Sequence, residues 1–129
     1  MPAKKILIVD DDQDLVKLLA RKLAQASFEA LTAFDASQAI RIAHKESPSL
    51  ILLDMKLPAG GGLGTLQILK NSIKTNMIPI IIITGQESAG TEREVRNYDV
   101  EHIMTKPLDM EALIKKIKEL LGEDIKPAC

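Results

Sequence analysis

The stretch Ile6-Leu7-Ile8-Val9-Asp10-Asp11-Asp12 decides the fold, because four consecutive apolar residues run directly into three aspartates. A strand in a parallel sheet that is covered by helices on both sides needs apolar side chains on both of its faces. A short unbroken apolar run therefore predicts such a strand. Asp11 or Asp12 is suited to cap a helix that follows it. Apolar residues at helical spacing predict the buried face of that helix, made of Leu15, Leu18, Leu19 and Leu23.

The same alternation of an apolar block with an amphipathic stretch continues along the chain. Further strands are predicted over Phe28–Phe34, Leu50–Leu53, Ile80–Ile83 and Glu101–Thr105. Further helices are predicted after Asp35, from about Leu63, weakly over Ser88–Asn97, and after Asp109. Five units of strand followed by helix predict an α/β fold, with a doubly wound parallel sheet that has helices on both faces.

Two details of this scheme concern glycines. The segment Met55–Gly62 carries Pro58 and three consecutive glycines, so it is predicted to be a loop. It is not a phosphate-binding loop, because no Gly-Lys-Ser/Thr follows and the spacing does not give G-x-G-x-x-G. The last helix is predicted to stop at Gly122 and to bury one face, made of Leu113, Ile114, Ile117, Leu120 and Leu121.

The composition fits one globular domain. The 129 residues are enough for a single hydrophobic core, so residues 1–129 are predicted to form one domain, without a second domain beside it. The formal net charge of -1 leaves no basic surplus for nucleic acid or an anionic membrane. The single cysteine, Cys129, cannot form an internal disulfide, no signal peptide is visible, and no apolar run is long enough to cross a bilayer. We therefore expect a cytoplasmic protein.

Polar residues stand where the predicted strands end. The first strand ends at the three aspartates, the third at Asp54, the fourth at Thr84, and the fifth just before Lys106. In an open parallel α/β sheet, ligands bind at the carboxyl ends of the strands. The sequence therefore directs several carboxylates, one hydroxyl and one ammonium group to the same edge.

These residue types are suited to phosphoryl chemistry around a metal ion. Crowded carboxylates repel one another unless a cation neutralises them, and a hard divalent ion such as Mg²⁺ prefers oxygen ligands. A carboxylate can also act as a nucleophile and form an aspartyl phosphate. Transfer of a phosphoryl group needs positioning and charge neutralisation, which a metal ion, a lysine and a hydroxyl donor supply.

Each of these residues alone has a simpler interpretation. Asp12 alone is a helix cap, Thr84 a strand-end hydroxyl and Lys106 a solvated charge. The combination is different, because an acid pair, a further acid, a hydroxyl and a lysine close four of the five predicted strands. His44 and His102 have no ligand partners at metal-site spacing, and they are interpreted as ordinary surface or strand-edge residues.

At these positions the sequence resembles a response-regulator receiver domain of two-component signalling. The resemblance covers essentially the whole chain, and the matching segments, in order and at the usual spacing, are Ile6–Asp12, Leu52–Pro58, Ile82–Gly85 and Thr105–Pro107. The resemblance implies a flavodoxin-like (βα)5 fold with strand order 2-1-3-4-5. It also implies a phosphoacceptor signalling domain, not an enzyme, whose donor is a phosphohistidine on a histidine kinase or histidine phosphotransfer protein, and whose output goes to an unknown downstream protein.

The resemblance also implies a role for each matching residue. Asp54 corresponds to the phosphoacceptor, and Thr84 and Lys106 to the hydroxyl and the ammonium group that contact the phosphoryl group. Asp11 corresponds to a direct Mg²⁺ ligand, while Asp10 holds the metal partly through water. Asp54 and the backbone carbonyl of Lys56 complete the metal ligands, and Pro107 is expected to follow a cis peptide bond.

The sequence departs from the family pattern at two places. Ile103 occupies a position that usually carries Tyr or Phe, so the usual aromatic switch is not expected here. Pro58 is followed by Ala59-Gly60-Gly61-Gly62 where the family usually has Pro-x-x-Asp-Gly, which removes an acid and adds backbone freedom. Lys56 is hypothesised to lean over the phosphoryl group and to change the lifetime of the phosphorylated state.

Two other functions compete with this interpretation. The Asp-x-Asp of Asp10–Asp12 is the nucleophile pattern of haloacid-dehalogenase-type phosphatases, which would carry phosphate on Asp10 and would not need Asp54. Asp14 stands where that family usually has Thr or Val, and the chain has no room for a cap domain. The other alternative is a receiver-like docking module that acts without phosphorylation.

Overall fold

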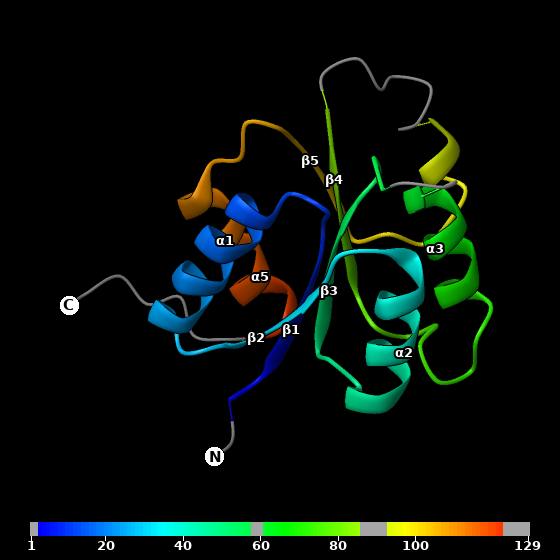
Figure 1. Ribbon diagram of the computed structural model, residues 1–129, viewed down its shortest axis with the longest axis horizontal. Helices are drawn as coiled ribbons and strands as arrows, with labels where there is room; N and C mark the ends of the chain where they lie inside the picture. Colours follow the sequence, from blue (N-terminus) through cyan, green and yellow to red (C-terminus); the bar gives the residue numbers. More distant parts are fainter. Residues whose placement is uncertain (1–2, 58–60, 86–92, 123–129) are drawn as a thin grey trace.

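The computed structural model describes residues 3–57, 61–85 and 93–122, and it contains one parallel five-stranded sheet (Figure 1). The strand order is β2-β1-β3-β4-β5, with every neighbouring pair parallel. This confirms the predicted α/β fold and the strand order implied by the family resemblance. The strands are β1 (Lys5–Val9), β2 (Glu29–Ala33), β3 (Leu50–Asp54), β4 (Ile80–Thr84) and β5 (His102–Thr105).

Helices cover both faces of the sheet. In Figure 1, α1 and α5 lie together on one side, and α2 and α3 lie on the other. The two faces have separate cores, because successive side chains of a strand point to opposite sides of the sheet. The described helices with full bounds are α1 (Gln13–Gln25), α2 (Ala36–Glu46), α3 (Gly61–Lys70) and α5 (Met110–Leu120).

The three central strands are buried from end to end. Every residue of β3 and β4 is buried, and so are four of the five residues of β1. The edge strands β2 and β5 are only partly covered. An unbroken apolar run is therefore the correct signal for β1, β3 and β4, whereas the edge strands had weaker signals and less certain ends. The predicted strand Phe28–Phe34 is shorter by one residue at each end.

Aspartate side chains begin three of the helices, as the sequence predicted. The Asp12 carboxylate accepts hydrogen bonds from the backbone N–H groups of Asp14 and Leu15. Asp35 and Asp109 cap α2 and α5 in the same way. Each cap satisfies N–H groups that have no partner within the helix. A negative charge at the N-terminus also interacts favourably with the positive end of the helix dipole.

The predicted buried face of α1 was wrong in one position. Leu18 is 40% exposed, and Val16 is buried in its place beside Leu19 and Leu23. The helix is rotated so that residues 16, 19 and 23 face the sheet, and apolar spacing alone does not distinguish this face from the neighbouring one. In α5 only Leu113 and Ile117 are fully buried, while the other three predicted residues are half-buried.

The predicted loop Met55–Gly62 was too long. Helix α3 already begins at Gly61, whose φ of 41° places it in the left-handed region, where glycine is favoured. Residues 58–60 of this loop lie outside the described residues. The weak helix predicted over Ser88–Asn97 lies partly outside them too, although residues 93–95 are helical. The last helix ends at Leu120 with Leu121 as its C-cap, directly before Gly122 with its φ of 69°, where the sequence predicts the stop.

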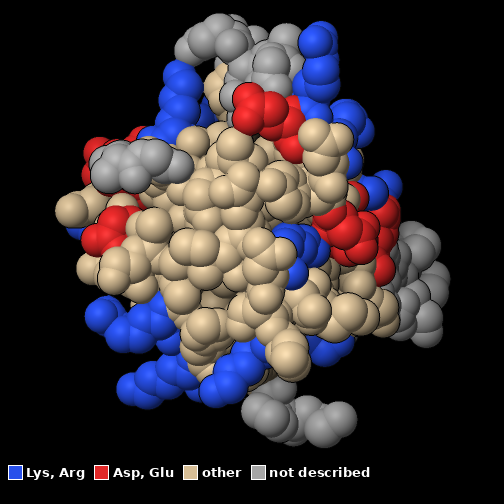
Figure 2. Space-filling model, turned by 90° about the vertical axis from the view of Figure 1, so that its right-hand side faces the viewer, with Lys and Arg blue, Asp and Glu red and all other residues tan. Residues whose placement is uncertain are grey.

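Helix α3 presents an uncharged surface. Its only charged residue is Lys70, and Figure 2, which faces the side of the molecule that carries α3, shows a broad central area almost without Lys, Arg, Asp or Glu. Ile68 is 49% exposed, so this helix also presents an apolar side chain to the solvent. No described helix is long and apolar enough to span a bilayer.

Gly62 allows α3 to pack directly on the end of β3, and this close approach gives a prediction. A Cβ atom at position 62 would lie 2.4 Å from the Met55 Cα atom and 2.7 Å from the Asp54 carbonyl oxygen. Gly62→Ala should therefore lower the free energy of unfolding by about 1–3 kcal/mol through overpacking, measured by urea denaturation.

Gly64→Ala is the matched control, because a Cβ atom there would meet nothing within 4 Å. At this half-buried position of the same helix, which has room for a methyl group, alanine should raise the free energy of unfolding by up to about 1 kcal/mol. Equal effects of the two substitutions would contradict the proposed contact at Gly62.

Candidate functional site

Backbone hydrogen bonds at the carboxyl edge of the sheet hold the strand ends side by side. The N–H of Met55 donates to the Ile83 carbonyl, and the N–H of Lys106 donates to the Thr84 carbonyl. The ladder that joins β3, β4 and β5 thus extends one residue beyond the strands. This arrangement brings the residues after β1, β3 and β5 to one place, as the sequence predicted.

Three carboxylates form a cluster at this edge. Asp10, Asp11 and Asp54 each contribute an oxygen, and these oxygens all lie within 4.8 Å of one another. Asp10 and Asp54 are buried, with exposed fractions of 1% and 2%, whereas Asp11 is exposed. The cluster therefore has two oxygens supplied from inside the protein and one from the solvent side.

Each buried carboxylate is oriented by its own loop. The backbone N–H of Asp12 donates to Oδ1 of Asp10 at 2.9 Å, and the backbone N–H of Lys56 donates to Oδ1 of Asp54 at 3.1 Å. Both bonds join residues two apart, so each turn fixes the side chain that precedes it. The remaining oxygen of each carboxylate, Oδ2, is left to face the lysine that follows β5.

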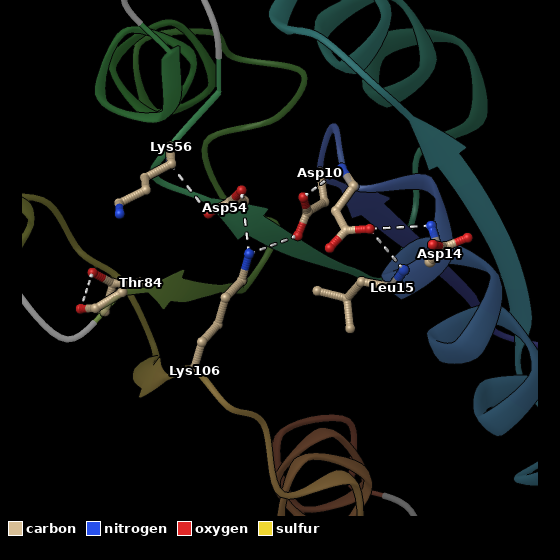
Figure 3. Close-up of polar contacts among 9 residues, drawn as sticks. Asp10, Asp14, Leu15, Asp54, Lys56, Thr84 and Lys106 are labelled. Atoms are coloured by element: carbon tan, nitrogen blue, oxygen red, sulfur yellow. Dashed lines mark hydrogen bonds and ion pairs between the residues drawn. The ribbon is translucent and has the colours of Figure 1, made fainter.

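Lys106 contacts both buried carboxylates. Its Nζ atom lies 3.3 Å from Oδ2 of Asp10 and 3.6 Å from Oδ2 of Asp54 (Figure 3). The ammonium group is about one-third exposed, so it closes the cluster on one side without sealing it. The Lys106–Pro107 peptide bond is cis, as the family resemblance implied.

The cluster is electrostatically crowded. The pKa of Asp10 is raised to about 6, chiefly by burial and also by the charge of Asp54, while the Asp12 N–H and Lys106 act in the opposite direction. For Lys106, burial acts to lower the pKa, but the charges of Asp54 and Asp10 outweigh it and the pKa is raised. One lysine thus holds a full positive charge without fully compensating two buried carboxylates.

The donor set fits a hard divalent cation. Within the described part of the chain, Oδ2 of Asp10 is a buried oxygen that accepts no hydrogen bond, although it lies in ion-pair range of Lys106. A buried acceptor without a donor is costly, and a cation bound there would satisfy it. Three carboxylates with no nitrogen or sulfur ligand suit Mg²⁺, which takes oxygen ligands and retains several waters.

Thr84 and Lys56 lie beside the cluster. In Figure 3, the contacts drawn for these two side chains do not reach the carboxylates. The Thr84 side chain is buried, and its hydroxyl donates to the Gly85 carbonyl at 3.3 Å. The side chain of Lys56 extends away from the carboxylates in Figure 3, while its backbone N–H holds Asp54. The hypothesis that Lys56 leans over the acceptor therefore requires a rotation of this side chain.

Sequence reasoning missed how the charges divide within the site. It treated the aspartates as equivalent in burial, and it did not anticipate that Lys106 contacts Asp10 more closely than Asp54. The signal for burial was present in the sequence, since Asp10 and Asp54 directly continue fully apolar strands while Asp11 begins a turn. His44, interpreted as an ordinary residue, is half-buried and bonded to Ser72, with 3.1 Å between Nε2 and Oγ.

Comparison with known proteins identifies what this arrangement is similar to. A family described as "Response regulator receiver domain" matches residues 6–118. "Response regulator PleD" of Caulobacter vibrioides is 32% identical over 90% of this chain, which spans only 26% of that protein. "Polar-differentiation response regulator DivK" of Brucella anthropi is 29% identical over 93% of this chain and 98% of its own length.

A solved structure has the same fold. The CheY-like response regulator receiver domain protein from Methanospirillum hungatei superimposes with a TM-score of 0.87 at 28% identity, and the match covers 93% of this chain and 94% of that one. The structural match thus covers both chains almost completely, whereas the match with PleD covers only a part of that longer protein.

The raised pKa of Asp10 predicts a gain in stability when this charge is removed. In the unfolded chain this carboxyl ionises near pH 3.8, whereas in the folded chain it ionises near pH 6. The folded state therefore loses stability relative to the unfolded state as pH rises from about 4 through 6. Without Mg²⁺, Asp10→Asn should raise the free energy of unfolding by about 1–3 kcal/mol at pH 8, and the gain should vanish near pH 4.

Urea denaturation in the presence of a chelator measures this difference at both pH values. Asp11→Asn is the matched control, because it removes an exposed carboxylate of the same cluster and should give a smaller gain. A loss of stability in Asp10→Asn at pH 8 would show that its contact with Lys106 outweighs the cost of burial.

Proposed function

The chain belongs to the response-regulator receiver domain family of two-component systems, and from this premise we propose that Asp54 accepts a phosphoryl group in a Mg²⁺-dependent phosphorelay. The observation that carries the proposal is the position of Oδ2 of Asp54. This buried carboxylate oxygen lies 3.6 Å from the Lys106 ammonium group, and Asp54 also contributes an oxygen to the cluster with Asp10 and Asp11, within 4.8 Å of theirs. It is held at the carboxyl edge of the sheet, where ligands bind in open parallel α/β sheets.

The proposed metal ligands are Asp10, Asp11, Asp54 and the backbone carbonyl of Lys56. The hydrogen bond from the Lys56 N–H to Asp54 supports this set, because it fixes the peptide segment next to the acceptor. Bound Mg²⁺ would neutralise charge on the acceptor and on the phosphoryl oxygens. The buried Oδ2 of Asp10, which accepts no hydrogen bond from the described residues, would gain the cation beside its ion-pair contact with Lys106.

In the proposed reaction, an oxygen of Asp54 attacks phosphorus and forms an acyl phosphate. The bond between phosphorus and the nitrogen of the donor histidine breaks, and the imidazole leaves with the bonding electron pair and takes up a proton. Lys106 stabilises the negative charge of the transferring group, and Thr84 donates its hydroxyl hydrogen bond to a phosphoryl oxygen after leaving the Gly85 carbonyl. The donor is a histidine kinase or histidine phosphotransfer protein, and the compartment is the cytoplasm.

The proposed output step differs from the usual pattern of the family. Ile103 is half-buried and packs against the core on the α2–α3 side of the sheet, together with Tyr98 and Val100. The Tyr98 hydroxyl accepts a hydrogen bond from the Gln67 side chain at 2.8 Å, which ties this segment to α3. A conformational switch in this chain must therefore operate without an aromatic side chain at position 103.

Phosphorylation at Asp54 is the first prediction of this proposal. After incubation with acetyl phosphate and Mg²⁺, intact mass spectrometry should find one added phosphoryl group on the wild type and none on Asp54→Asn. A chelator should abolish the modification, because the crowded carboxylates need a cation before they accept further negative charge.

The alternatives give different results in the same experiment. A phosphatase of the haloacid-dehalogenase type would carry the phosphate on Asp10, so peptide mapping would find it there and Asp54→Asn would still be modified. A docking module would bind Mg²⁺ and remain unmodified. Either result would reject the phosphoacceptor function of Asp54.

The lifetime of the phosphorylated state tests the role of Lys56. If its ammonium group folds over the phosphoryl group, it shields phosphorus from water and stabilises the negative charge, so Lys56→Asn should dephosphorylate several-fold faster. Loss of phosphate after removal of the donor measures this rate. Lys45→Asn, an exposed lysine on α2, is the control for a general charge effect. An unchanged rate in Lys56→Asn would reject the hypothesis.

A further inference from the structure

A groove runs between α1 and α5, on the face of the sheet that these two helices cover. It has a volume of about 510 Å³. The helices lie next to each other in Figure 1, and their inner sides pack on the same core cluster. Lys22, Gln25 and Ala26 line it from α1, and Met110, Ile114 and Lys118 are among the residues that line it from α5.

The floor of the groove is apolar. Ala26, Met110 and Ile114 are half-buried, so each packs inward and still presents surface to the groove. Met110 and Ile114 are four residues apart and therefore share one face of α5. Leu18, which is 40% exposed, lies one turn before Lys22 and continues the same stripe of α1. The apolar surface thus extends beyond the groove along α1.

The rim of the groove is positively charged. Lys22, Lys115 and Lys118 line it, against a single acid, Glu111. Within the described part of the chain these three lysines form no ion pair, whereas Lys116, on the same helix, is paired with Glu119 at 3.4 Å. An excess of two positive charges around an apolar floor remains uncompensated, although the chain as a whole carries a formal net charge of -1.

We propose that this groove binds an acidic amphipathic helix of a partner protein. Such a helix would place apolar side chains on Ala26, Met110 and Ile114 and carboxylates beside the lysines of the rim, as amphipathic helices do in apolar grooves. From Met110 to Lys118 the groove follows about 12 Å of α5, so two to three turns of partner helix fill it. Charge complementarity fixes the orientation of the helix and raises its rate of association.

A nucleic acid fits this surface less well than an acidic helix. Phosphate backbones are bound by stripes of Lys and Arg without an apolar floor, and the described groove has no aromatic side chain on which a base could stack. A second copy of the chain would need an acidic apolar helix of its own, and the described helices that carry apolar faces use them against the sheet. A partner helix with an apolar face and acidic flanks complements both the apolar floor and the positively charged rim of the groove.

The proposal is tested with a fluorescein-labelled peptide of about 16 residues that has Leu at i, i+3, i+4 and i+7 and Glu on the flanking positions. A matched peptide with Lys in place of Glu serves as the first control. Fluorescence anisotropy should show that the acidic peptide binds the full chain and that the basic peptide does not. Amide chemical shifts in ¹⁵N NMR spectra should move along α1 and α5.

The protein variants separate groove binding from a general effect of charge. The double variant Lys22→Glu with Lys118→Glu should weaken binding at least about tenfold. Lys45→Glu with Lys74→Glu makes the same change in net charge on exposed residues of α2 and the α3–β4 segment, and should leave binding unchanged. Phosphorylation by acetyl phosphate checks that both variants are folded. Lys115→Glu is a second groove variant that requires only one substitution.

Several results would overturn the proposal. These are the absence of binding by the acidic peptide, equal binding to the groove variant, or chemical-shift changes away from α1 and α5. A single-stranded RNA oligonucleotide that binds more tightly than the peptide and loses affinity in the groove variant would assign the groove to nucleic acid. A dimer in sedimentation experiments that disappears in the groove variant would assign it to a second copy.

Discussion

The burial of two like charges at one edge of the sheet is the constraint on which the site depends. Asp10 and Asp54 are almost inaccessible, and among the described side chains only Lys106 forms an ion pair with both. Two carboxylates and one ammonium leave a net negative charge in a poorly solvated place, and burial together with the charge of Asp54 raises the pKa of Asp10. The folded chain is therefore less stable than its core alone would allow, and binding of a cation would restore part of that stability.

The apolar core makes this imbalance tolerable. Strands β3 and β4 are buried from end to end and β1 is buried except at Lys5, so the hydrophobic free energy of the sheet is large compared with the cost of one crowded site. The same strands also hold the site rigid, because Asp10 and Asp54 directly follow residues whose side chains are fixed on both faces. Gly62 adds to this rigidity by letting α3 contact the backbone of Met55 and Asp54.

The sequence predicts the parts of the fold where a single pattern has a single structural solution. The runs Ile6–Val9 and Leu50–Leu53 can only be buried strands, and Asp35 and Asp109 are efficient caps, so these elements were confirmed. Apolar spacing on α1 is ambiguous between adjacent faces, which explains the wrong placement of Leu18. The start of α3 was predicted too late, because three consecutive glycines are typical of a loop. Their role in close packing depends on contact with the end of β3, which the residues of α3 alone do not indicate.

The sequence predicts which residues form the candidate site, but not their burial, their ion pairs or the direction of their pKa shifts. These properties bear on whether the site can be coupled to the groove between α1 and α5. Asp10 accepts a hydrogen bond from the N–H of Asp12, and Asp12 caps α1. Lys106 stands three residues before Asp109, which caps α5. The two helices that line the groove, α1 and α5, therefore begin next to the acidic cluster, so a change of charge there lies close to the first turn of each. Contact alone does not make two sites cooperative, because coupling requires two arrangements that differ in free energy at both sites. The incompletely neutralised carboxylates would supply the free-energy difference at the acidic cluster. A change in the position of α1 relative to α5 would be needed to carry this difference to the groove.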